Sequence, residues 1–246
     1  MSIESEADLL GLRAVGAVVA EALEAMRRRV APGVTTLELD AAAEAVLRRH
    51  GAGATPQRVY GFPGWSCVSV NSEAVHGIPG KRMLRDGDVV KLDVTADLAG
   101  FVADAARTVV VGLNEIGARL AACARAAFEQ ALLSARAGNR TRDIGRAVER
   151  EVHRHGFAVL PDLAGHGVGR SVHEPPCVPN YDEPRARDVL VRGMVLTIEP
   201  IIAARRSRVY EARDGWTIGT ANGSLTAHHE ETIVITDGLP IVLTAA

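Results

Sequence analysis

The chain repeats itself at a fixed interval, and this repeat restricts the folds that it can adopt. When the sequence is shifted by 105 residues, eight positions between residues 33 and 56 are identical to their counterparts. The matched pairs are Gly33 and Gly138, Thr36 and Thr141, Ala42 and Ala147, Glu44 and Glu149, Arg49 and Arg154, His50 and His155, Gly51 and Gly156, and Pro56 and Pro161. Each copy has the pattern of a glycine turn, a threonine N-cap, a helix and a glycine stop. Such a duplication predicts a pseudo-twofold α/β fold whose polar positions meet at a central sheet.

The repeat continues beyond these helices. Ala-rich segments at about 6–29 and 114–137 lack internal proline and are expected to be the preceding helices. With a slip of one residue, the segment 86–93 matches the segment 192–199, so that Asp93 corresponds to Glu199, and the strand holding Asp104 has its counterpart near Glu230. We therefore expect helix-helix-strand halves around a central curved antiparallel sheet, an α/β (α+β) architecture with acids at equivalent positions.

Two aspartates flank a predicted hairpin. Residues 88–95 and 101–111 read as strands, and the residues from Asp97 to Gly100 have the composition of a tight turn. Pairing Asp97 with Gly100 places Asp93 directly opposite Asp104, with Cβ atoms roughly 4.5–5.5 Å apart. Such a pair is destabilising unless one carboxyl is protonated or a cation lies between them. The alternative is a solvated edge hairpin whose acids are incidental.

Composition limits the classes of function. A formal net charge of −2 gives no electrostatic case for nucleic acid or for an anionic membrane surface as a partner. The three cysteines are scattered and odd in number, which favours a reducing compartment over a disulfide framework. The acidic N-terminus is unlike a signal peptide, and no apolar run has the length of a membrane span. We expect a soluble cytoplasmic protein with a single domain over residues 1–246.

Three further residues join the aspartates as candidate ligands. Glu199 ends an apolar run in which a solvated acid is not expected, although an acid paired with an arginine would also fit there. His166 lies between glycines that allow close backbone approach and leave its imidazole free. In a strand over residues 228–236, alternation turns Glu230 toward the site and Glu231 toward solvent.

The five candidates together predict a metal centre. Four carboxylates and one imidazole in a partly buried cleft need about two divalent cations to offset their charge. Such a ligand set suits Mn, Fe, Co or Zn, and a pair of ions that share bridging carboxylates activates water and polarises a carbonyl. The candidate ligands are Asp93, Asp104, His166, Glu199 and Glu230.

Several motifs resemble type I methionine aminopeptidases, over essentially the whole chain. They are the segments 75–79 (Val-His-Gly-Ile-Pro), 165–175 (Gly-His-Gly-Val-Gly-Arg-Ser-Val-His-Glu-Pro), 197–200 (Thr-Ile-Glu-Pro), 214–217 (Asp-Gly-Trp-Thr) and 230–234 (Glu-Glu-Thr-Ile-Val). The resemblance implies the pita-bread fold, a duplicated α/β domain, which agrees with the repeat. It also implies removal of the initiator methionine from nascent polypeptides when the second residue is small.

The resemblance assigns a role to each matching position. It implies that the five candidates are metal ligands and that Glu199 is also the general base and acid. His76 and His173 match histidines beside the substrate that stabilise the tetrahedral intermediate or transfer protons. Phe62, Cys67 and Trp216 match positions in the methionine pocket. The resemblance also favours a monomer. It implies that the protein works close to the ribosome.

Some positions depart from the family pattern. Val172 stands where an aromatic residue is usual, Leu163 also replaces an aromatic residue, and Pro56 and Val59 replace the common Cys and Tyr of the pocket segment. Ala105 follows Asp104 where Thr is usual. These changes spare the candidate ligands but predict a wider or differently shaped pocket. Two alternatives stay open: an enzyme related to X-Pro peptidases, and an inactive binding protein with the same fold.

Overall fold

The structure is a computed structural model that describes residues 2–245, and its helices follow the sequence repeat. The described helices are α1 (Glu6–Arg29), α2 (Thr36–Arg49), α3 (Thr55–Tyr60), α4 (Glu115–Ser134) and α5 (Thr141–Arg154). A shift of 105 residues carries both ends of α2 onto the ends of α5. The helix predicted at 6–29 is confirmed, and the one predicted at 114–137 is shorter by a few residues at its ends.

The predicted threonine N-caps are wrong by one position. Thr36 and Thr141 are the first residues of their helices, and the caps are the preceding Thr35 and Arg140. The hydroxyl of Thr35 accepts a hydrogen bond from the Glu38 main-chain N–H, and the Glu38 carboxylate accepts one from the Thr35 N–H at 2.8 Å. Thr35 and Thr36 both have the chemistry of a cap, so residue type alone does not separate them. Arg140 has no such chemistry, and its N–H donates a hydrogen bond to the Asp143 carboxylate at 2.9 Å.

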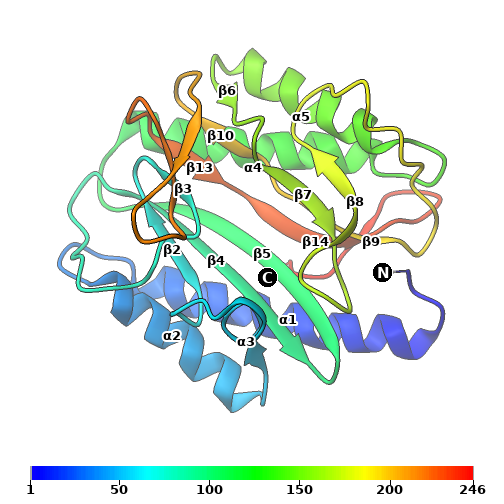
Figure 1. The fold of residues 1–246 in the computed structure, drawn as a ribbon, viewed down its shortest axis with the longest axis horizontal. Coiled ribbons are helices and arrows are strands. Elements are labelled where there is room, and N and C mark those ends of the chain that lie inside the picture. The colour runs from blue at the N-terminus through cyan, green and yellow to red at the C-terminus, as the bar shows by residue number, and fades with distance from the viewer. Residues whose placement is uncertain (1, 246) are drawn as a thin grey trace.

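A nine-stranded antiparallel sheet occupies the centre of the molecule (Figure 1). Its main path runs β1-β4-β5-β14-β9-β7-β8, with β2 beside β4 and β15 beside β14. The strands are β1 (Gly53–Ala54), β2 (Cys67–Val70), β4 (Val89–Leu98), β5 (Phe101–Val110), β7 (Ala164–Gly167), β8 (Glu174–Pro179), β9 (Val195–Ile198), β14 (Glu230–Val234) and β15 (Ile241–Val242).

Two three-stranded sheets complete the fold. One has the order β13-β10-β6 and the other β11-β12-β3. Their strands are β3 (Glu73–Val75), β6 (Ala158–Val159), β10 (Ile201–Ala203), β11 (Val209–Glu211), β12 (Ile218–Thr220) and β13 (Thr226–His228). None of the helices in residues 2–245 has the length and apolar character needed to span a bilayer.

The central path confirms the predicted pseudo-twofold arrangement. In the order β4-β5-β14-β9, the inner strands β5 and β14 belong to different halves, and so do the outer strands β4 and β9. Helices α1 and α2 pack with the first half and α4 and α5 with the second, each around its own hydrophobic core (Figure 1). The two halves meet at β5 and β14, where the paired residues are Glu230 with Ala106 and Glu231 with Ala105.

The hairpin of β4 and β5 is observed with a different register from the predicted one. Asp93 lies opposite Ala106, and Asp104 lies opposite Thr95. The turn consists of Ala99 and Gly100, which have φ values of 50° and 82° as a two-residue hairpin turn requires. The register therefore shifts by two residues, and because side chains alternate with a period of two, both aspartates keep the same face. They are diagonal neighbours and do not lie directly opposite each other.

Candidate metal centre

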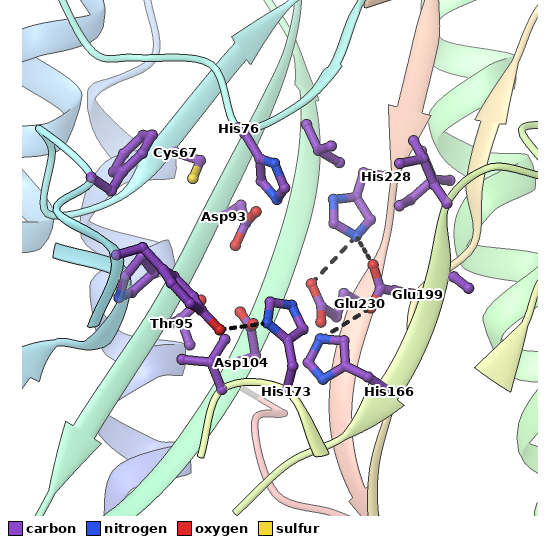
Figure 2. Close-up of a pocket in the computed structure, with 18 of the residues that line it drawn as sticks. Cys67, His76, Asp93, Thr95, Asp104, His166, His173, Glu199, His228 and Glu230 are labelled. Carbon is purple, nitrogen blue, oxygen red and sulfur yellow. Dashed lines mark hydrogen bonds and ion pairs between the residues drawn. The ribbon is translucent and has the colours of Figure 1, made fainter. Parts of the chain in front are cut away.

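A cavity opens over the junction of the two halves and is lined by all the residues to which the sequence assigned a catalytic, metal-binding or substrate-binding role (Figure 2). These are Phe62, Cys67, His76, Asp93, Asp104, His166, His173, Glu199, Trp216 and Glu230. Its volume of about 220 Å³ is smaller than the roughly 300–1,000 Å³ of sites for drug-sized ligands. The space suits one side chain and its adjoining main chain.

The first half supplies the two aspartates of the cavity. Asp93 on β4 and Asp104 on β5 point into it from neighbouring strands (Figure 2). Burial raises the pKa of Asp93 well above its ordinary value, and the Asp104 carboxylate raises it further. Burial also raises the pKa of Asp104, although a hydrogen bond from the buried Thr95 hydroxyl opposes this. Burial of two neighbouring carboxyl groups destabilises the folded chain, so this arrangement indicates a function other than stability.

The second half supplies the two glutamates. Glu199 follows the last residue of β9, and Glu230 begins β14. Their exposed fractions are 8% and 2%, and burial together with neighbouring carboxylates raises the pKa of each well above its ordinary value. The hydroxyl of Thr197 donates a hydrogen bond to Glu199 Oε1 at 2.9 Å. The strand predicted over residues 228–236 is interrupted at His229, but Glu230 lies in the cavity as alternation predicted.

His166 is held in one orientation by its own strand. A Cβ atom at Gly167 would lie 2.3 Å from the Pro175 carbonyl oxygen, and one at Gly165 would lie 2.6 Å from the Thr197 oxygen. The close approach of β7 to its neighbours therefore requires both glycines. His166 Nδ1 lies 2.9 Å from the Gly167 carbonyl oxygen, an acceptor, so Nδ1 carries the proton. Nε2, at 3.5 Å from Glu199 Oε1, is left with its lone pair toward the cavity.

Glu231 is not solvated, contrary to the prediction. Its side chain does point away from the cavity, but it is buried behind the sheet. Its carboxylate accepts hydrogen bonds from Arg107 Nη2 and from the Thr244 hydroxyl, each at 2.5 Å. The reason is that helices α1 and α4 and the C-terminal segment cover this face, as the lining of the groove there shows. Alternation predicts the direction of a side chain, but it does not predict what covers it.

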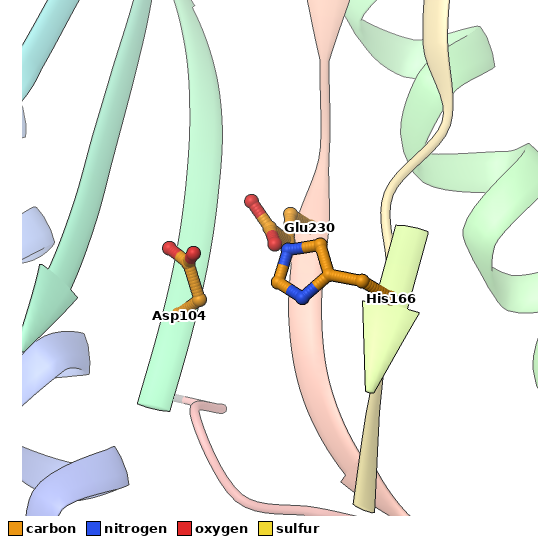
Figure 3. Close-up of side chains that lie close together, drawn as sticks. All are labelled: Asp104, His166 and Glu230. Atoms are coloured by element: carbon orange, nitrogen blue, oxygen red, sulfur yellow. The ribbon is translucent and has the colours of Figure 1, made fainter. Parts of the chain in front are cut away.

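The ligand atoms of the site fit a divalent cation. Asp104, His166 and Glu230 bring one ligand atom each to within 4.8 Å of one another (Figure 3). Asp104 Oδ1 and Glu230 Oε1 are buried and have no hydrogen-bond partner within residues 2–245. Buried carboxylate oxygens without a partner are costly unless a cation accompanies them. Carboxylates with a neutral imidazole are a donor set that first-row divalent metals accept.

An apolar wall closes one end of the cavity. Phe62 and Trp216 pack edge to face with ring centroids 5.2 Å apart, and the buried Cys67 lies on β2. Val172 and Leu163, two of the departures from the family pattern, also line the cavity. Val59 does not, because its side chain is about half exposed on α3. The expected effect of Val59 on the pocket therefore has no structural basis.

Three polar residues of the cavity were not found from the sequence. Tyr60 lies on α3 with its hydroxyl 2.9 Å from His173 Nδ1, and Thr95 lies beside Asp104. His228 is 2% exposed, and burial lowers its pKa to about 3. A signal was available for His228, because the alternation that places Glu230 in the cavity also places the residue two positions earlier there. No comparable pattern marks Tyr60.

Known proteins resemble the chain along its whole length. The profile of metallopeptidase family M24 matches residues 11–237. Methionine aminopeptidase 2 of Bacillus subtilis is 42% identical over 247 residues, which cover 99% of both sequences. The crystal structure of methionine aminopeptidase from Thermotoga maritima has a TM-score of 0.96 and 36% identity over all of both chains. Prolidase from Pyrococcus horikoshii is less similar, at 25% identity and a TM-score of 0.77, with 99% of this chain and 63% of that one covered. The resemblance to methionine aminopeptidases and the pita-bread fold are confirmed.

Proposed function

Because the chain belongs to metallopeptidase family M24, we propose that it is a methionine aminopeptidase that removes the initiator methionine when the second residue is small. The observation that carries this proposal is 42% identity to a methionine aminopeptidase over 99% of both sequences. The cavity supports it independently, because a space of about 220 Å³ combines a cluster of buried acids with an apolar wall. A single catalytic domain over residues 1–246 is part of the proposal.

The centre would hold two divalent ions, of Co, Mn, Fe or Zn. The proposed ligands are Asp93, Asp104, His166, Glu199 and Glu230, and their unpartnered buried oxygens support the assignment. When bound, such ions supply a water activated for attack at neutral pH and polarise the scissile carbonyl.

Glu199 is the proposed general base and acid. It would take a proton from the attacking water and return it to the leaving amine. Its Oε1 already accepts a hydrogen bond from Thr197 at 2.9 Å, which fixes the direction of the carboxylate. Burial raises the pKa of Glu199 above the ordinary value of a glutamate, which is the direction that suits a group that both takes up and returns a proton.

His76 and His173 would act on the substrate carbonyl and the leaving group. Both line the cavity, and Figure 2 shows the His76 ring between Asp93 and His228. The Tyr60 hydroxyl lies 2.9 Å from His173 Nδ1 and so can fix the orientation of that ring. His173 Nε2 is then the atom left to donate to, or accept from, the substrate.

Phe62, Cys67 and Trp216 are proposed to bind the methionine side chain. A thioether is flexible and polarisable, and it packs well against aromatic ring edges. Val172 would leave space that a ring fills in related enzymes, so we expect weaker discrimination between methionine and leucine. The enzyme is further proposed to act as a monomer in the cytoplasm, near the ribosome, on chains that have just been made.

A peptide assay tests the proposal. The purified protein is stripped of metal, reloaded with Co, Mn, Fe or Zn, and tested with Met-Ala-Ser and Ala-Pro-Ala. We expect metal-dependent release of methionine from the first peptide and little cleavage of the second.

The other outcomes separate the alternatives. Preferential cleavage of Ala-Pro-Ala would favour an X-Pro peptidase, to which prolidase is the relevant structural relative. Absence of cleavage with every metal, in a protein that still binds the ions, would favour a binding protein. Either result would contradict the proposed function.

A further inference from the structure

One buried histidine of the cavity has no role among the proposed ligands. His228 is the last residue of β13, and 2% of it is exposed. Its Nε2 lies 3.3 Å from Glu230 Oε2 and 3.7 Å from Glu199 Oε2 (Figure 2). Neither ring nitrogen has a hydrogen-bond partner among the described residues. A buried polar side chain without a partner is unusual and requires an explanation.

The position of this imidazole is fixed by the backbone. The Thr108 hydroxyl accepts a hydrogen bond from the His228 N–H and donates one to the His228 carbonyl oxygen, both at 2.8 Å. His228 ends β13 and Glu230 begins β14, on either side of the break at His229, and both line the cavity, whereas His229 and Glu231 line the groove behind the sheet. The main chain at the end of β13 thus aims the ring at the acids.

The neighbours of His228 form a second group of potential ligands. Glu199, His228 and Glu230 bring ligand atoms to within 4.8 Å of one another, as do Asp104, His166 and Glu230. Glu230 belongs to both groups, and bridging carboxylates are characteristic of paired metal sites. All three residues of the second group are buried, so this group is not an exposed acidic cluster.

We propose that His228 is a sixth protein ligand of the metal centre, whose Nε2 binds a divalent cation together with Glu199 and Glu230. The inference rests on the metal centre of the proposed function and extends it. The centre would then have two imidazole ligands, His166 and His228. Additional nitrogen donors favour Zn and Co over Mn and Mg, which prefer oxygen.

The number of bound imidazoles is the direct test. X-ray absorption spectroscopy of the Zn-loaded wild-type protein should detect two imidazoles for the ion pair, and His228→Gln should have one fewer. The double variant His166→Gln, His228→Gln should have none. Affinity for Zn, measured by competition with a chelator, should fall about 10–100-fold in His228→Gln, a scale known even for residues that only orient ligands.

The adjacent histidine provides a matched control. The His229 ring packs near the Phe128 ring, at 5.1 Å between centroids, on the opposite face of the strand. His229→Gln should therefore keep both the imidazole count and the Zn affinity of the wild-type protein. Circular dichroism verifies that each variant is folded. If a variant is unfolded, the number of imidazoles in the X-ray absorption spectrum of the wild-type protein still tests the inference.

One imidazole in the wild-type spectrum, or a count and affinity unchanged in His228→Gln, would overturn the inference. These outcomes are separate from failure of the proposed function. A protein that cleaves Met-Ala-Ser with one bound imidazole would keep the function and lose the inference. A protein with two bound imidazoles that releases no methionine would do the reverse.

Discussion

Replacing Glu231 with glutamine should reduce the stability of the protein and spare most of its activity. The side chains of Glu231 and Arg107 are 7% and 22% exposed, and their closest atoms are 2.5 Å apart. Breaking a buried ion pair on one side costs about 3–5 kcal/mol. Glutamine keeps one acceptor oxygen for Arg107, and its amide nitrogen can donate to the Thr244 hydroxyl that now donates to Glu231, so a loss of about 2–3 kcal/mol is expected. At about 2–4 °C per kcal/mol for a chain of this size, Tm should fall by about 4–12 °C.

The neighbouring Glu230→Gln is the informative comparison. It removes a carboxylate from a cluster that includes Asp104 and Glu199, so repulsion in the metal-free protein decreases or stays the same. Tm of the metal-free protein should not fall, whereas kcat/KM should be almost lost because a proposed ligand is removed. Two adjacent glutamates would then have opposite effects on stability and activity.

Thermal unfolding in chelator, followed by circular dichroism, and kcat/KM for Met-Ala-Ser with added metal measure both quantities. The reasoning is refuted if Glu231→Gln unfolds at the wild-type temperature but has lost its activity. It is also refuted if Glu230→Gln is active with metal and unfolds early without it.

Three further changes have defined expectations. Asp104→Asn should abolish peptidase activity and lower the bound metal per chain without unfolding the protein, and a fully active variant with unchanged metal content would contradict the ligand assignment. Gly167→Ala should lower stability by about 1–3 kcal/mol, measured by urea unfolding, because its Cβ would lie 2.3 Å from the Pro175 carbonyl oxygen. Val172→Phe should increase the preference for Met over Leu and norleucine peptides in kcat/KM by a factor that corresponds to about 1–3 kcal/mol. Strong rejection of Leu by the wild-type protein would refute this argument.

The internal repeat predicts most of the fold, and strand alternation predicts which side chains form the site. The equal bounds of α2 and α5 follow from identities at one offset, because the same local signals recur. Asp93 and Asp104 were placed on the correct face in spite of a register error. The error arose because Ala99 was not expected to adopt a positive φ, which favours glycine or asparagine.

Other features depend on contacts that no local pattern encodes. The burial of Glu231 depends on Arg107 and Thr244, which are distant in sequence from it. The hydrogen bond between Tyr60 and His173 joins residues 113 positions apart. Such partners are defined only when the two halves are assembled, so sequence alone gave the direction of these side chains without their surroundings.

The seam between the halves has a consequence for the lifetime of the protein. Strands β5 and β14 pair over only two residues each, and the proposed ligands come from both sides of this seam. Ions held there would link the halves. A ligand that binds only the folded chain stabilises it by RT ln(1 + [L]/Kd), which is about 2.7 kcal/mol when the free ligand concentration is a hundred times Kd. In a cell short of metal, the seam would open more often and expose the chain to proteolysis. Metal supply would then set how much of the protein survives, in addition to how fast each molecule works.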